Sequence, residues 1–277
     1  MSDFLELQRG ELPLIVSFPH TGTDLPPAIE TQLASAWLAR QDADHFIHRL
    51  YDFAHGLGAT TLRTTVSRSV IDVNRDPSGA SLYPGQNTTE LCPTTTFDGE
   101  PLYPEGRLPD AREIAQRRAT YFAPYHAALA AEITRLRADH AQVVLFDAHA
   151  IRSRVPRLFD GLLPELNLGT HDGRSCSLQL QHVLEQLCAA TPFSRVTNGR
   201  FKGGWTTRHY GQPALGVHVV QLELAMRAFL DEPTLPPSAA NWPPPYDVAR
   251  AAPLRQLLER LLRACITFAL SPLGAFP

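Results

Sequence analysis

Three segments of the chain share one pattern, in which a run of apolar residues leads to a polar side chain. They are residues 14–20, which end at His20, residues 143–149, which end at His149, and residues 217–223, which end at Glu223. Short apolar runs rich in β-branched residues predict buried strands. Open α/β sheets bind ligands beyond the carboxyl ends of their strands. Two histidines and a glutamate at such ends are the components of a metal-assisted hydrolase.

The run that ends at His149 is the most informative of the three. Asp147 and His149 are two residues apart, so both side chains point to the same face of the predicted strand. A single histidine after a strand more often has a structural role than a metal-binding one. Here, however, two such histidines and a glutamate occur at strand ends of one fold, and this combination favours a metal site more than a single histidine does.

Composition places the chain among globular proteins. Its 277 residues, 44% of them hydrophobic, are sufficient for a full core, and we expect one α/β domain over residues 1–277. The net charge is −3 and no block of basic residues occurs, so neither nucleic acid nor a membrane is an expected partner. No apolar run approaches membrane-spanning length. The first residues do not resemble a signal peptide and the four cysteines form no paired motif, so we expect reduced thiols and a cytoplasmic protein.

Strand-like and helix-like segments alternate along the chain, which predicts an α/β fold. Strands are expected at residues 60–66 and 69–76, in addition to the three above. Helices are expected at residues 31–57 (with a break), 110–140, 175–190 and 253–270. Two long loops are expected, one from the turn at residue 76 to residue 109 and a Pro-rich one over residues 233–245. Nothing in the pattern predicts the oligomeric state.

Cations accompany two of these segments. Asn74 and Arg75 end the strand expected at residues 69–76, and a guanidinium can bind a carboxylate through two parallel hydrogen bonds. A surface arginine paired with Asp76 would give the same pattern. Residues 201–211 combine Lys202 and Arg208 with a pair of glycines, which would let the backbone approach a ligand, although paired-glycine turns are common.

Taken in order, the motifs resemble those of the N-formylglutamate amidohydrolase (deformylase) family. The matching pieces are residues 17–22, 49–54, 67–79, 82–85, 146–152, 201–211 and 218–223. The family is similar in fold to zinc carboxypeptidases and aspartoacylase-like deacylases. The resemblance therefore implies a single domain with a central mixed sheet, helices on both faces, and one metal ion at the strand ends.

The resemblance also implies a ligand set for that ion. His20 and His149 are implied as ligands, with zinc the first expectation among the divalent ions. The carboxypeptidase pattern would place a glutamate three residues after the first histidine, where this chain has Thr23. Asp44 is then implied as the third ligand, because the family has an acidic residue shortly before its Arg-Leu-Tyr motif, and Asp24 is the alternative.

One departure bears on that assignment. His48 stands where the resemblance would place an acid just before Arg49. Asp147 is implied as a residue that orients a ligand rather than as a ligand itself.

The activity implied by the resemblance is hydrolysis of N-formyl-L-glutamate to formate and L-glutamate, in histidine degradation. Glu223 would act as the general base. Arg75 or Arg68 would stabilise the oxyanion or bind a carboxylate, with Asn74 assisting. The cations implied for the second carboxylate are Lys202 and Arg208.

Two other interpretations of the sequence remain. One is a related metal-dependent deacylase that acts on a different N-acyl amino acid. The other is a protein that keeps the arginines, binds a small anion and has no catalytic activity. Metal content would separate the second from the enzymes, and the acyl group released would separate the two enzymes.

Overall fold

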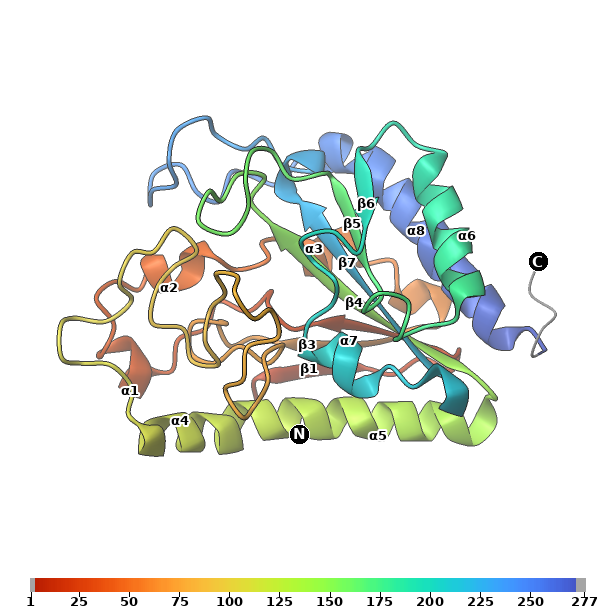
Figure 1. The fold of residues 1–277 in the computed structure, drawn as a ribbon, viewed down its shortest axis with the longest axis horizontal. Helices are drawn as coiled ribbons and strands as arrows, with labels where there is room; N and C mark the ends of the chain where they lie inside the picture. The colour runs from red at the N-terminus through yellow and green to blue at the C-terminus, as the bar shows by residue number, and fades with distance from the viewer. Residues whose placement is uncertain (1–2, 273–277) are drawn as a thin grey trace.

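The computed structural model describes residues 3–272, which form one α/β domain around a seven-stranded sheet of order β1-β3-β2-β4-β7-β5-β6 (Figure 1). The sheet is mixed, because β1 runs antiparallel to β3 and β5 runs antiparallel to β7, whereas the other neighbours are parallel. The strands are β1 Leu5–Gln8, β2 Leu14–Phe18, β3 Thr60–Thr64, β4 Val143–Ile151, β5 Leu166–Gly169, β6 Arg195–Thr197 and β7 Val217–Ala225. The predicted fold class is confirmed.

Helices cover both faces of this sheet. On one side lies a long helical rod made of α4 Ala111–Arg117, a π-helical turn Arg118–Phe122 and α5 Ala123–Asp139; on the other lie α6 Leu178–Ala189 and α8 Val248–Leu270 (Figure 1). The shorter helices are α1 Pro27–Glu30, α2 Leu38–Gln41, α3 Ile47–Leu50 and α7 Trp205–Tyr210. Single 3-10 turns occupy His55–Leu57, Pro213–Leu215 and Met226–Ala228. Among the residues described, no helix combines the length and apolar character that a membrane crossing requires.

Alternation along β4 explains how one strand serves both a core and a site. Its residues that face α8 stay apolar along the whole strand: Val144, Phe146, Ala148 and Ala150 all join one buried cluster. On the opposite face the strand begins with Val143 and Leu145, which pack with α5, and then changes to Asp147 and His149. Because side chains alternate between faces, this face is apolar under α5 and polar toward the carboxyl end.

The neighbouring strands repeat this change on the same face. In the strand register Ser17, Asp147 and Gln221 lie in one row across β2, β4 and β7. His149 and Glu223 are paired in a second row, which continues to Asn167 on β5. Two polar rows therefore cross the sheet on the face that carries α5. Both strands continue two residues further, so His149 and Glu223 lie inside their strands rather than at the last position predicted.

Most of the predicted elements occur. The helices expected at residues 110–140, 175–190 and 253–270 are confirmed, although the last begins earlier, at Val248, where the Asp247 side chain accepts hydrogen bonds from two helical N–H groups. The Pro-rich loop has neither helix nor strand. Strands β1, β5 and β6 were not predicted.

Three local predictions were wrong. Residues 31–57 do not form one broken helix but turns with the short helices α2 and α3, and Phe46 between these has a left-handed backbone (φ 63°) that a continuous helix cannot contain. Residues 69–76 form no strand. Residues 201–211, whose composition suggested one loop, form a loop only as far as the glycine pair and continue as helix α7.

Candidate metal centre and active-site cleft

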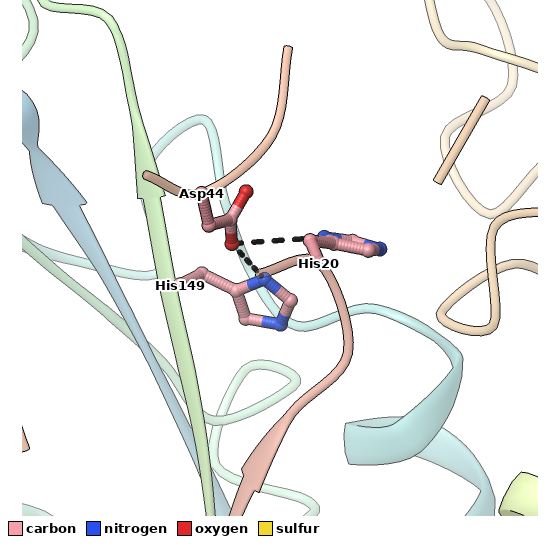
Figure 2. Close-up of side chains that lie close together, drawn as sticks. All are labelled: His20, Asp44 and His149. Atoms are coloured by element: carbon pink, nitrogen blue, oxygen red, sulfur yellow. Dashed lines mark hydrogen bonds and ion pairs between the residues drawn. The ribbon is translucent and has the colours of Figure 1, made fainter. Parts of the chain in front are cut away.

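Three side chains implied as metal ligands converge at one point. His20 follows β2, His149 belongs to β4, and Asp44 lies between α2 and α3 (Figure 2). Asp44 Oδ2 is 3.0 Å from His149 Nδ1 and 3.7 Å from His20 Nδ1. One potential ligand atom from each residue lies within 4.8 Å of the others, and none of the three residues is more than 3% exposed.

Asp44 reaches this point through its backbone as well as its carboxylate. Its N–H donates to the carbonyl of His20 (2.9 Å), and its Oδ2 accepts from the N–H of Ala150 (3.1 Å). The connection between α2 and α3 is therefore attached to both histidine-bearing segments. Asp24, the alternative ligand, is exposed in an isolated bridge to Val66 and does not join the group.

The donor set fits a divalent ion. His20 Nδ1 and Asp44 Oδ1 are buried without a hydrogen-bond partner, which is costly unless something else binds them. Burial alone would raise the pKa of Asp44, but the neighbouring imidazoles of His149 and His20 outweigh it, lower the pKa and keep the carboxylate ionised. Two imidazole nitrogens and one carboxylate oxygen are a donor set of the kind that catalytic zinc sites use, with a fourth position open for water.

A second layer of carboxylates orients the two imidazoles. His20 Nε2 donates to Asp72 (2.6 Å), and His149 Nε2 donates to Asp147 (3.0 Å). In each ring this leaves Nδ1 facing the shared point, which is how outer carboxylates fix the tautomer of a metal-binding histidine. Asn74 connects the layer, because its Nδ2 is 3.1 Å from Asp147 Oδ2 and 3.0 Å from His149 Nε2.

Asp72 was not singled out from the sequence. It accepts from Arg68 (2.6 Å) and from the N–H of Asn74 (2.9 Å), in addition to His20. A signal was available, since Asp72 stands four residues after one candidate arginine and two before the candidate asparagine. A buried arginine requires a carboxylate partner, and this position could supply it.

Glu223 lies beside the candidate metal centre on the adjacent strand. It is paired in register with His149, and Gln221 Nε2 donates to its Oε2 (3.2 Å). Burial raises the pKa of Glu223 to about 7; His149 opposes the rise, and Asp44 adds to it. A carboxylate with a pKa near neutrality is suited to accept and return a proton at physiological pH.

A cleft opens over these groups. Its lining includes His20, His149 and Glu223 from the sheet and the arginines Arg68 and Arg75. Arg68 is buried against Asp72, and its guanidinium lies 4.8 Å from the centre of the Phe97 ring. Arg75 Nε and Nη2 donate to the backbone and hydroxyl of Thr89 (3.0 and 3.1 Å).

The remaining substrate-binding candidates are placed differently. Lys202 and Arg208 are not among the residues that line the cleft. Lys202 Nζ forms an exposed ion pair with Asp172 (3.1 Å), while Arg208 donates to the carbonyl of Gly203 (3.1 Å) and lies over the ring of Tyr83. Their place in the cleft is taken by Arg200, two residues before Lys202, which sequence reasoning missed because nothing in the local pattern distinguishes it from them.

Comparison of the sequence with known proteins points to one family. The model of the family N-formylglutamate amidohydrolase matches residues 12–230. A protein named N-formylglutamate deformylase from Pseudomonas aeruginosa is 49% identical over 265 residues, which covers 95% of this chain and 97% of the relative. A protein of the same name from Pseudomonas putida is 43% identical and covers 97% of each chain.

Two solved structures share the fold. The crystal structure of N-formylglutamate amidohydrolase from Ralstonia eutropha superposes with a TM-score of 0.78 at 22% identity and covers 96% of this chain and 98% of its own. The gene product Atu2144 of Agrobacterium tumefaciens superposes with a TM-score of 0.71 at 16% identity, over 96% and 95% of the two chains. With the family model matching most of its length, this chain belongs to the N-formylglutamate amidohydrolase family.

Proposed function

We propose that this protein hydrolyses N-formyl-L-glutamate to formate and L-glutamate, as a step of histidine degradation, with one divalent ion bound by His20, Asp44 and His149. The observation that carries the proposal is the buried group of these three side chains, with unpartnered Nδ1 and Oδ1 atoms, next to Glu223 in an open cleft. The names of the two relatives in Pseudomonas support the substrate. Zinc is the ion that this donor set favours.

The reaction requires a nucleophile and a proton carrier. A bound ion would lower the pKa of a water molecule and polarise the formyl oxygen. Glu223 would accept the proton of that water and pass it to the departing amine nitrogen, so that the C–N bond of the formamide breaks and the water oxygen remains in formate. Its raised pKa and its place beside His149 support both transfers.

The arginines of the cleft divide into two roles. Arg68 is bonded to Asp72 and lies 3.6 Å from Asp44 Oδ1, so it balances the charge of the carboxylates around the imidazoles and can stabilise an oxyanion there. Arg75 is anchored through Nε and Nη2, and we assign it to the carboxylate next to the scissile amide. Asn74 accepts from the N–H of Thr206 (2.8 Å) and supports Asp147, so it holds the site together.

The proposal is tested by two measurements on the purified protein. Metal analysis should give one zinc per chain, and formate should be released from N-formylglutamate in a manner that a chelator abolishes and added zinc restores. Acetate release from N-acetylglutamate should be much slower. Turnover of N-acetylglutamate in place of N-formylglutamate would assign the related deacylase activity, and a metal-free protein without turnover would assign neither.

A further inference from the structure

Arg200 lies in the loop between β6 and α7 and lines the cleft. Its Nε donates to the carbonyl of Leu158 (2.7 Å) and its Nη2 donates to the carbonyl of Asn87 (2.8 Å). The rings of Tyr83 and Phe201 lie 5.4 and 5.3 Å from the guanidinium carbon. Two backbone carbonyls and two aromatic rings thus fix the orientation of this side chain before any ligand binds.

The three arginines of the cleft differ in their ion pairs. Arg68 and Arg75 both have the carboxylate of Asp72 within 4.0 Å, at 2.6 and 3.8 Å. Arg200 forms no ion pair with any residue that the structure describes. Its two hydrogen bonds use Nε and Nη2, so Nη1 remains available to a ligand. Burial lowers the pKa of Arg200; Tyr83 and Glu223 oppose this change, and Arg75 adds to it. A partly desolvated cation without a counter-ion is costly, and a bound anion would offset that cost.

The arginines also differ in which residues they contact, and this difference indicates which anionic group of a ligand each one can bind. Arg68 contacts Asp44 of the candidate metal centre, whereas the contacts of Arg200 are with Leu158, Asn87 and the two rings, all outside that centre. A ligand that places its amide at the centre and extends along the cleft would therefore bring its far end to Arg200.

From this geometry we infer that Arg200 is the binding site for the distal carboxylate of the substrate, and so the residue that makes an acidic side chain preferred. The inference rests on the proposed hydrolysis of N-formylglutamate and deepens it. Arg200 takes the role that the sequence pattern assigned to Lys202 and Arg208, which lie outside the cleft.

The test compares two substrates that differ only in the distal charge, N-formyl-L-glutamate and N-formyl-L-glutamine. In R200M the ratio of their kcat/KM values should fall roughly tenfold to a hundredfold, the effect of losing a charge-assisted hydrogen bond. Turnover of the glutamine substrate should change little, because it never used the guanidinium charge. R200Q removes the charge but keeps an amide that can donate to the Leu158 carbonyl, so it should show the same fall if R200M does not fold.

R195M is the matched control, because Arg195 is an exposed arginine on β6 and does not line the cleft. Its substrate ratio should equal that of the unmodified protein. An unchanged ratio in a folded R200M or R200Q would overturn the inference while leaving the proposed activity intact. Absence of formate release by the unmodified protein from either substrate would overturn the proposed activity, and the inference with it.

Discussion

The two sides of the cleft are built from different parts of the chain. On one side, which we name the sheet wall, the side chains of His20, His149 and Glu223 project from β2 and its exit, β4 and β7. On the other side, the loop wall, Arg75, Tyr83, Thr88, Thr89, Arg200 and Phe201 come from segments without strands or helices.

The bonding of the two walls differs accordingly. In the sheet wall, buried side chains bond to other buried side chains, as His20 does to Asp72 and His149 does to Asp147. In the loop wall, partly exposed side chains bond to backbone carbonyls, as Arg75 does to Thr89 and Arg200 does to Asn87. A rigid sheet suits chemistry, which requires fixed geometry, whereas loops can change residues without disturbing a core. Changes in the sheet wall should therefore affect metal content and kcat, and changes in the loop wall should affect substrate preference.

The largest effect is expected for H149A. It removes one of the two imidazoles proposed to bind the ion, so the protein should lose its metal, and kcat/KM should fall on the order of a thousandfold or more. Metal analysis and formate release measure the two losses. H182A, at an exposed histidine of α6, is the control and should keep both metal and activity. Full metal content in H149A would show that the ligand set is wrong.

E223Q should separate metal binding from proton transfer within the sheet wall. The amide is similar in shape to the carboxylate but cannot accept the proton of water, so kcat should fall roughly 10²- to 10⁴-fold while metal content stays at the level of the unmodified protein. Steady-state kinetics with metal analysis of the same sample is the measurement. If kcat remained near normal, Glu223 would not be the base.

D72N tests the layer behind the imidazoles. The variant keeps all three proposed ligands but replaces the carboxylate that accepts from His20 and Arg68, so metal affinity should fall about 10- to 100-fold. Competition with a chelator of known affinity measures the change. Activity should return at saturating metal, unlike in H149A, and unchanged affinity would mean that Asp72 only balances the charge of Arg68.

R75K moves the test to the loop wall. Lysine keeps the charge but lacks the planar fork that donates to Thr89 and to a carboxylate together. The cost in kcat/KM for N-formylglutamate should be about 1–3 kcal/mol, with metal content unchanged. Loss of metal in R75K would contradict the division of roles between the two walls, because the loop wall would then contribute to metal binding as well.

The last prediction concerns stability rather than activity, at a contact between α5 and the segment that precedes Asn74. His126 of α5 donates through Nε2 to the carbonyl of Val73 (2.8 Å), next to Asn74, and burial lowers its pKa from 6.5 to about 4. As the pH falls from 6.5 to 4, an unfolded chain gains a proton at this residue that the folded chain does not, so stability decreases by up to about 1.4 kcal/mol per pH unit.

H126Q should lose that share of the pH dependence. Denaturant titrations of both proteins between pH 8 and 4 would measure it, and the difference isolates His126 from other histidines whose pKa values burial also lowers, such as His45 and His218. Identical pH profiles for H126Q and the unmodified protein would mean that the Val73 contact does not depend on a neutral imidazole.

The sheet wall could largely be predicted from the sequence, because its information is local. A strand exposes alternate residues to one face, so the run from Val143 to His149 already specifies which side chains point toward the site. The placement of Asp44 could not be derived in this way. It came from the family resemblance, and its attachment to the carbonyl of His20 joins segments with no common pattern.

Prediction failed where side chains compete with the sheet for backbone groups. Val70, Ile71 and Val73 are buried and apolar, which suggests a strand. In the structure the N–H of Asp72 donates to the carbonyl of Leu91, and its carboxylate accepts the N–H of Asn74, so the segment folds as a buried loop. Arg200 was missed for a related reason, since only the contacts with two other loops, at Asn87 and Leu158, distinguish it from neighbouring cations.

The pairing of His149 with Glu223 across β4 and β7 has a consequence for how such a protein can diversify. Adjacent strands lie about 4.8 Å apart, so hydrogen-bond spacing sets the separation of the proposed ligand and the proposed base. A one-residue slip of either strand would turn its polar residues toward α8 and its apolar residues toward the cleft. The slip would therefore disrupt the sheet wall and the hydrophobic core together. Insertions and exchanges can therefore accumulate in the loops, while the two strands must be inherited as a unit. New acyl amino acids would be accommodated by grafting loops onto an unchanged strand pair, and an engineer could follow the same route.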